Sequence, residues 1–181
     1  MSPGLKLVRR MTIHTSVHNS LSLKSHTLQW YRGYAETVLL ALQHPRFQRF
    51  LNWFLRREHI PVQYVKAIQV RMFPRIKANG QHLKGAATSH GIITIYPQDI
   101  PRNTSAKDLV QSDAFPLAYV QWRARATLIH ELLHYKYRHR EQRVRQLTQQ
   151  YMQRCMQPTT SVMQRVFTRI FRTPSHCVGA G

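Results

Sequence analysis

The sequence predicts an α+β fold: a small antiparallel sheet followed by a long helix, with flanking helices toward both ends of the chain. Three patterns support this prediction. Apolar side chains recur at three- and four-residue spacing over residues 28–55, as on the buried face of helices. Residues 62–96 contain segments of alternating apolar and polar side chains around an Asn-Gly turn, as strands do. A further helical stripe begins after Pro116.

The N-terminal residues 1–60 are predicted to form an extension with a helical pair. Residues 1–24 mix Ser, Thr, His and Lys with short apolar runs, which predicts weak order. The stripe from Leu28 to Leu42 predicts the first helix. Pro45 suits the first turn of the second helix. The apolar face of that helix consists of Phe47, Phe50, Leu51, Phe54 and Leu55.

The sheet is predicted to be a three-stranded antiparallel meander. Residues 62–73 form the first strand, because Ile68, Val70 and Met72 alternate with polar residues. Asn79-Gly80 signals a turn. Residues 82–88 and 92–96 are the next two candidate strands.

The C-terminal half is predicted to be helical. A polar connection over residues 98–115 leads to the long helix that contains Trp122, Leu128 and Leu132. Pro158 precedes a last amphipathic helix over residues 162–171. Residues 174–181 are expected to form a loose tail.

The long helix contains His130-Glu131-Leu132-Leu133-His134, an HExxH pattern. Positions i and i+4 of a helix share one face, so His130 and His134 can bind one Zn²⁺ at about 2.0–2.1 Å each. Glu131 can then accept a proton from a water molecule at the metal, the role of a general base. For a chain with 11 His in 181 residues, the chance of such a pattern is roughly 1 in 70. The sequence therefore predicts a zinc site with Glu131 as its catalytic residue.

These residues resemble the active-site helix of a zincin metallopeptidase. The order of a small sheet, an HExxH helix and further helices is similar to compact gluzincin-like peptidases. It also resembles the SprT-like group, whose members process protein on DNA. The resemblance covers roughly residues 62–151, and Lys136 departs from it, since a hydrophobic residue is usual at that position. It implies a zincin-like metallopeptidase domain over residues 61–173 that hydrolyses peptide bonds.

A catalytic zinc site takes three protein ligands and leaves one position for water. Gluzincin-like sites take a Glu from a helix downstream of the motif, and Glu141 is the only acidic residue after His134. A second helix is predicted to begin near residue 139, with Glu141 in its first turn, from the spacing of Val144, Leu147, Tyr151 and Cys155.

The alternative third ligand is His139, because SprT-like sequences place a third His shortly after the motif. In an unbroken helix His139 would lie about 500° round from His134, off the ligand face. Either ligand therefore requires a break in the helix near residues 137–139, although no Pro or Gly is present there. Glu141 is the predicted third ligand, and the competing interpretation makes it a surface acid paired with an Arg.

In zincins the strand before the active helix usually lies at the sheet edge and pairs with extended substrate. An edge strand offers unpaired N–H and C=O groups to a peptide. The resemblance therefore implies that substrate binds along Ile92, Ile93, Thr94, Ile95 and Tyr96. An edge strand without such a role is the competing interpretation.

The charge of the chain is strongly positive, with 27 Lys and Arg against 7 Asp and Glu and a net charge of +20. Such a balance favours attraction to polyanions, including non-specific binding of nucleic acid. No nucleic-acid-binding motif is evident. Besides a peptidase that acts on a peptide or protein substrate, two interpretations stay open: a nucleic-acid-associated, SprT-like protease, and a non-catalytic zincin-fold binding protein with a structural zinc.

The two cysteines, Cys155 and Cys177, form neither a CxxC pair nor a disulfide framework, which favours a reducing, cytoplasmic location. No apolar run approaches the roughly 18 residues of a transmembrane helix. Residues 1–35 contain no acidic residue and several Ser, a composition typical of a mitochondrial transit peptide, so mitochondrial targeting is the alternative.

Overall fold

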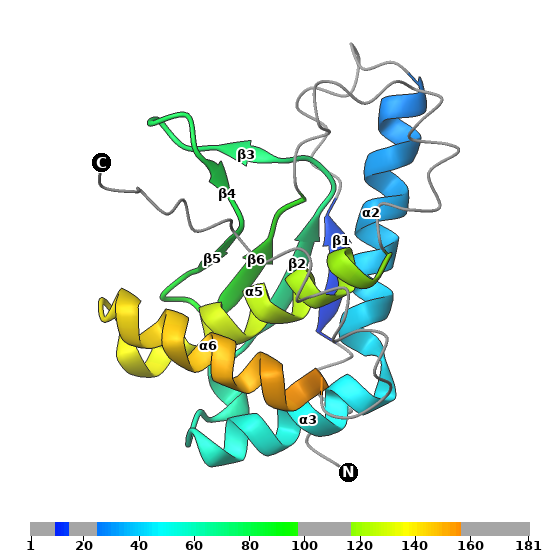
Figure 1. The fold of residues 1–181 in the computed structure, drawn as a ribbon. Helices are drawn as coiled ribbons and strands as arrows, with labels where there is room; N and C mark the ends of the chain where they lie inside the picture. Colours follow the sequence, from blue (N-terminus) through cyan, green and yellow to red (C-terminus); the bar gives the residue numbers. More distant parts are fainter. Residues whose placement is uncertain (1–9, 15–24, 98–116, 157–181) are drawn as a thin grey trace, which may run out of the picture.

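The computed structural model describes residues 10–14, 25–97 and 117–156, and its architecture is α+β, as predicted (Figure 1). Four strands form one mixed sheet, in the spatial order β1 (Met11–His14), β2 (Ala67–Arg71), β6 (Ile92–Ile95) and β5 (Gly85–Ala87). A separate hairpin consists of β3 (Arg75–Ile76) and β4 (His82–Leu83). The described helices are α2 (Ser25–Gln43), α3 (Pro45–Arg57), α5 (Leu117–Tyr137) and α6 (Glu141–Met156), with a 3₁₀ turn at Val62–Tyr64.

The helices begin and end close to the predicted positions. Pro45 occupies the first turn of α3, and the side chain of His44 accepts a hydrogen bond from the Arg46 backbone N–H at 3.3 Å. This cap and the proline, which needs no N–H partner in a first turn, separate α3 from α2. The predicted long helix is α5, which begins directly after Pro116.

The predicted antiparallel meander is wrong. Within the four-stranded sheet, β2 is parallel to β1 and to β6, and only β5 is antiparallel to its neighbour, β6. The segment predicted as one strand over residues 82–88 is divided at Lys84 into β4 and β5, which belong to different sheets. Alternation of apolar residues reports which face of a strand is buried, but it carries no information about the direction of the neighbouring strand.

The Asn79-Gly80 turn is confirmed. Gly80 has a φ of 78°, a left-handed conformation that glycine adopts without a steric penalty. The turn closes with a hydrogen bond from the Lys77 N–H to the Gln81 carbonyl at 2.8 Å. It therefore reverses the chain between β3 and β4.

The prediction of weak order for residues 1–24 is wrong at residues 11–14, which form β1. Met11 lies opposite Ile68 in a parallel pairing with β2. A four-residue strand gives too few residues for a recognisable pattern, and its pairing depends on residues far along the chain.

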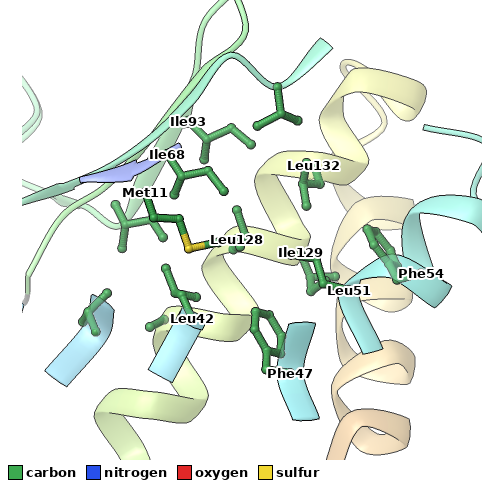
Figure 2. Close-up of a cluster of buried hydrophobic side chains, with 14 of the residues drawn as sticks. Met11, Leu42, Phe47, Leu51, Phe54, Ile68, Ile93, Leu128, Ile129 and Leu132 are labelled. Atoms are coloured by element: carbon green, nitrogen blue, oxygen red, sulfur yellow. The ribbon is translucent and has the colours of Figure 1, made fainter. Parts of the chain in front are cut away.

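The core lies between the sheet and the helices, with α5 at its centre (Figure 2). Leu128 and Leu132 of α5 face the sheet, where they meet Ile68 and Ile93. Ile129 of the same helix faces α3. All five side chains are fully buried, so α5 is covered on two sides and its backbone is held rigidly.

The helical pair shares this core. Leu42 of α2 and Phe47, Leu51 and Phe54 of α3 are buried with the residues of α5 (Figure 2). The described residues of α2 and α3 therefore pack in the same core as α5. The predicted helix over 162–171, the tail over 174–181 and the connection over 98–115 lie outside the described residues. Among the helices that the structure describes, none combines the length and apolarity needed to cross a membrane.

Candidate metal centre

His130 and His134 lie one turn apart near the end of α5, on the side of the helix that the core leaves partly open. Their side chains are 25% and 26% exposed, in contrast to the buried leucines between them. The two Nε2 atoms are 3.1 Å apart. The helix thus aims two imidazole nitrogens at one point, as the i, i+4 spacing predicts.

The helix breaks near residues 137–139, where a third ligand downstream of His134 requires a break. α5 ends at Tyr137, Arg138 adopts a φ of 45°, and α6 begins at Glu141. The Arg138 N–H still donates to the His134 carbonyl at 2.9 Å, so the left-handed residue directly follows the last helical turn. A left-handed conformation costs a residue with a side chain roughly 1–2 kcal/mol, and the usual signals for it, Gly or Asn, are absent at this position.

Glu141 comes from the first turn of α6 and reaches back to both imidazoles. Its carboxylate oxygens lie 3.7 Å from the His130 Nε2 and 3.3 Å from the His134 Nε2. Tetrahedral ligand atoms at about 2.0–2.1 Å from Zn²⁺ lie roughly 3.3–3.4 Å from one another. The group formed by His130, His134 and Glu141, with its ligand atoms within 4.8 Å of one another, could therefore hold a metal ion, and its residue types are ones that bind zinc.

The backbone fixes the orientation of His134. Its Nδ1 lies 2.6 Å from the Arg138 carbonyl oxygen, which can only accept, so Nδ1 carries the proton. The lone pair is then on Nε2, the atom that faces His130 and Glu141. A hydrogen bond on the far nitrogen is the usual way in which proteins orient a metal-binding imidazole.

The pKa values of His130 and Glu141 are both shifted in the direction that favours their metal-binding forms. Burial lowers the pKa of His130, which favours the neutral imidazole, and Glu141 partly offsets this effect. Burial would raise the pKa of Glu141, but Arg145 and the two imidazoles together hold it below its usual value. Arg145 Nε donates to Glu141 at 2.6 Å, so Glu141 has the arginine partner of the competing interpretation as well as the two histidines.

His139, the alternative ligand, is exposed in the turn between α5 and α6. Among the described residues, the only group of metal-binding side chains is the one that contains Glu141. The structure therefore brings Glu141, and not His139, to the paired histidines.

Glu131 is buried beside the metal-binding group and contacts the edge of the sheet. Burial raises its pKa to about 7, and a hydrogen bond from the Ala87 backbone N–H acts in the opposite direction. A Cβ atom added to Gly85 would lie 2.8 Å from the Glu131 Oε1 and 2.6 Å from the Thr127 Cγ2. The absence of a side chain at Gly85 thus makes room for the carboxylate.

The predicted substrate strand, Ile92–Tyr96, is not at the edge of the sheet. β6 has β2 on one side and β5 on the other, so its backbone groups are already paired. Ile93, Thr94, Ile95 and Tyr96 are buried. The prediction of an edge position for these residues is wrong, because the chain continues the sheet with β5 beyond β6.

β5 is the edge strand next to the metal-binding group. The Thr88 N–H donates to the Ile92 carbonyl, and the Tyr96 N–H donates to the Lys84 carbonyl. Hydrogen-bonded pairs alternate along an antiparallel ladder, so the backbone groups of Gly85 and Ala87 face away from β6. No strand in the described part of the chain pairs with that side of β5.

Sequence reasoning missed Gly85, Ala87 and Arg138. The run of small residues over 85–87 was the one available signal, since a glycine within a strand often marks the close approach of another group.

Comparisons of the chain with protein-family models, with curated proteins and with solved structures gave no match.

Proposed function

We propose that this protein is a zinc-dependent metallopeptidase with a zincin-like fold. The observation that carries the proposal is the convergence of the His130 and His134 Nε2 atoms and the Glu141 carboxylate, next to the buried Glu131. The mixed sheet followed by the paired-histidine helix supports the zincin-like assignment. Three protein ligands, without a fourth such residue among the described ones, favour a catalytic site over a closed structural site.

In this proposal His130, His134 and Glu141 hold the metal. Zn²⁺ bound there would supply Lewis-acid chemistry, lowering the pKa of a water molecule and polarising the scissile carbonyl. Glu131 accepts the proton of the attacking water and donates it to the leaving amine. The Ala87 N–H orients the Glu131 carboxylate, and the space at Gly85 lets it approach the edge of the sheet.

The substrate in this proposal lies along β5 instead of β6. An extended peptide can pair with the outward backbone groups of Gly85 and with the Ala87 carbonyl, as an added strand. Glu131 already uses the Ala87 N–H, so the scissile bond would lie next to the point where β5 contacts this carboxylate. Among the described strands, β5 alone both lies at an edge of the sheet and approaches Glu131.

The test is the zinc content of the wild type and of Glu131→Gln, Glu141→Ala and His139→Ala, with casein cleavage measured on the same preparations. We expect one zinc ion and cleavage for the wild type. Glu131→Gln should keep zinc and lose cleavage by about 10² or more, because the general base is removed. Glu141→Ala should lose zinc, and His139→Ala should keep both.

Each result has a defined meaning. Loss of zinc in His139→Ala with retention in Glu141→Ala would reverse the ligand assignment. A closed zinc site without cleavage would point to the non-catalytic binding protein. A wild type that contains no zinc after expression in zinc-rich medium would overturn the proposal.

A further inference from the structure

On another side of the α5–α6 corner, four cationic side chains line one pocket. Arg57 comes from the end of α3, Lys136 from the end of α5, and Arg143 and Arg154 from α6. This basic pocket, defined by these four residues, has a volume of about 420 Å³. Such a volume lies within the range of small-molecule binding sites.

One acid, Glu58, lies in the pocket lining, and the chain itself satisfies it. Its carboxylate accepts from Lys136 Nζ at 2.9 Å and from the Tyr137 hydroxyl at 3.0 Å. The Tyr151 hydroxyl donates to the other oxygen. Glu58 therefore neutralises Lys136, and its one ion pair among the described residues is with this lysine.

The three guanidinium groups have no carboxylate partner within the described residues. Arg154 lies over the Trp53 ring, with its Cζ 4.3 Å from the ring centroid, and Arg57 lies 5.7 Å from the same centroid. A guanidinium whose face is on an aromatic ring keeps N–H edges available for an anion, and Arg57 also makes one hydrogen bond with the Tyr151 side chain. Arg143 is exposed and makes no ion pair in this part of the chain.

The basic pocket and the metal-binding group occupy different faces of α6. At 100° per residue, Arg143 and Arg154 lie about 200° and 220° round the helix from Glu141. The two sites therefore differ in position, and they also differ in charge. Binding in the pocket can be tested without reference to the metal.

We propose that the basic pocket binds a phosphate group. Three guanidinium forks around one pocket match the several acceptor oxygens of a phosphate, and arginine binds phosphate oxygens in pairs. The phosphate could come from a nucleic-acid strand or from a free small molecule, and the chemistry of recognition is the same. This inference is independent of the proposed peptidase activity.

The test compares the wild type with Arg57→Gln/Arg143→Gln/Arg154→Gln and with a charge-matched control, Arg49→Gln/Arg56→Gln/Lys66→Gln. All six side chains are exposed, and the control residues do not line the pocket, so both variants should fold. The probes are inorganic phosphate, measured by equilibrium dialysis, and a fluorescein-labelled oligothymidylate without terminal phosphate, measured by anisotropy. Urea unfolding checks that each variant is folded, and Arg143→Gln alone serves as a milder second variant.

The pocket variant should lose affinity by about tenfold or more, since it removes several hydrogen bonds between charged groups. The control should change much less, and Arg143→Gln should lie between them. A loss of affinity for inorganic phosphate alone would identify a small molecule as the source of the phosphate. A loss of affinity for the oligothymidylate alone would identify a nucleic-acid strand as the source. Equal affinities in the pocket variant and the control for both probes, or no saturable binding by the wild type, would overturn the proposal.

Discussion

Two glutamates meet the corner between α5 and α6, and their surroundings differ. Glu58 is 6% exposed, and Lys136, Tyr137 and Tyr151 donate hydrogen bonds to it. The Glu141 side chain is 45% exposed and faces two imidazole nitrogens. The chain thus supplies every donor for the first carboxylate.

Glu141 instead has a single exposed donor, Arg145 Nε at 2.6 Å, and its oxygens also face the Nε2 atoms of two imidazoles. The proton of His134 is on Nδ1, bound to the Arg138 carbonyl, so its Nε2 presents a lone pair to the glutamate. Two such acceptors facing each other are unfavourable unless a cation or a proton lies between them. The comparison teaches that the same residue type is structural where the chain completes its hydrogen bonds, and a candidate functional group where it does not.

The largest expected effect is the loss of Glu58. Glu58→Ala removes a buried acceptor that joins α3, α5 and α6, so the free energy of unfolding should fall by about 3 kcal/mol. Urea denaturation in the presence of a chelator measures this loss. Glu141→Ala in the same chelated state should change the free energy by less than about 1 kcal/mol, and equal losses in the two variants would contradict the comparison.

The next effect concerns the candidate functional side. Gly85→Ala places a Cβ against the Glu131 Oε1 and the Thr127 Cγ2, so the carboxylate must move. We expect casein cleavage to fall by about tenfold or more while zinc content is retained, because general-base catalysis depends on position. The matched control is Gly33→Ala in α2, where an added Cβ meets nothing within 4 Å. Full activity in Gly85→Ala would show that Glu131 is not constrained by this contact.

A smaller effect is expected in the pH dependence of stability. Although burial acts to raise the pKa of Glu58, the hydrogen bonds from Tyr151, Lys136 and Tyr137 hold it below its usual value. A lowered folded-state pKa means that the unfolded chain binds the proton more readily, so this contribution is present above about pH 4.3 and is lost as the pH falls through the folded-state pKa. Glu58→Gln should therefore reduce the slope of the unfolding free energy against pH at acid pH, by at most about 1.4 kcal/mol per pH unit. If the slope at acid pH is the same in Glu58→Gln and in the wild type, the pH dependence of stability comes from other carboxylates.

The smallest effect concerns the turn that the two regions share. Arg138→Gly should raise the free energy of unfolding by about 0.5–1 kcal/mol in the chelated protein, since glycine adopts the left-handed conformation without strain. Zinc binding should persist, because the carbonyl that orients His134 belongs to the backbone. Arg140→Gly is the matched control and should lower stability, since Arg140 does not have a positive φ. Destabilisation by Arg138→Gly would mean that the side chain contributes more than the strain costs.

Local pattern was sufficient for the helices and for the meeting of His130, His134 and Glu141. The histidine spacing fixed one face of α5, and the scarcity of acids after His134 left a single carboxylate to consider. The break at Arg138 was predictable from the geometry that this ligand demands, although the residue itself gives no turn signal.

The remaining features depend on contacts between distant residues. The direction of β6 and the position of β5 beyond it depend on how the chain returns after the β3–β4 hairpin, which alternation does not encode. Lys136 was visible as a departure from an apolar flank, but its partner, Glu58, lies on another helix. Gly85 shows no apolar pattern, and its role appears only when α5 packs against it.

The parallel pairing of β1 with β2 also limits the order in which a nascent chain can acquire its structure. Met11 lies opposite Ile68, so β1 cannot find its partner until α2 and α3 have left the ribosome. Contacts between such distant residues form slowly, because a long loop must close before they gain any energy. Until that loop closes, the edge of β2, with the apolar Ile68 and Val70, is open to pairing with another chain. During synthesis β1 therefore has no strand partner until residues up to Arg71 have emerged.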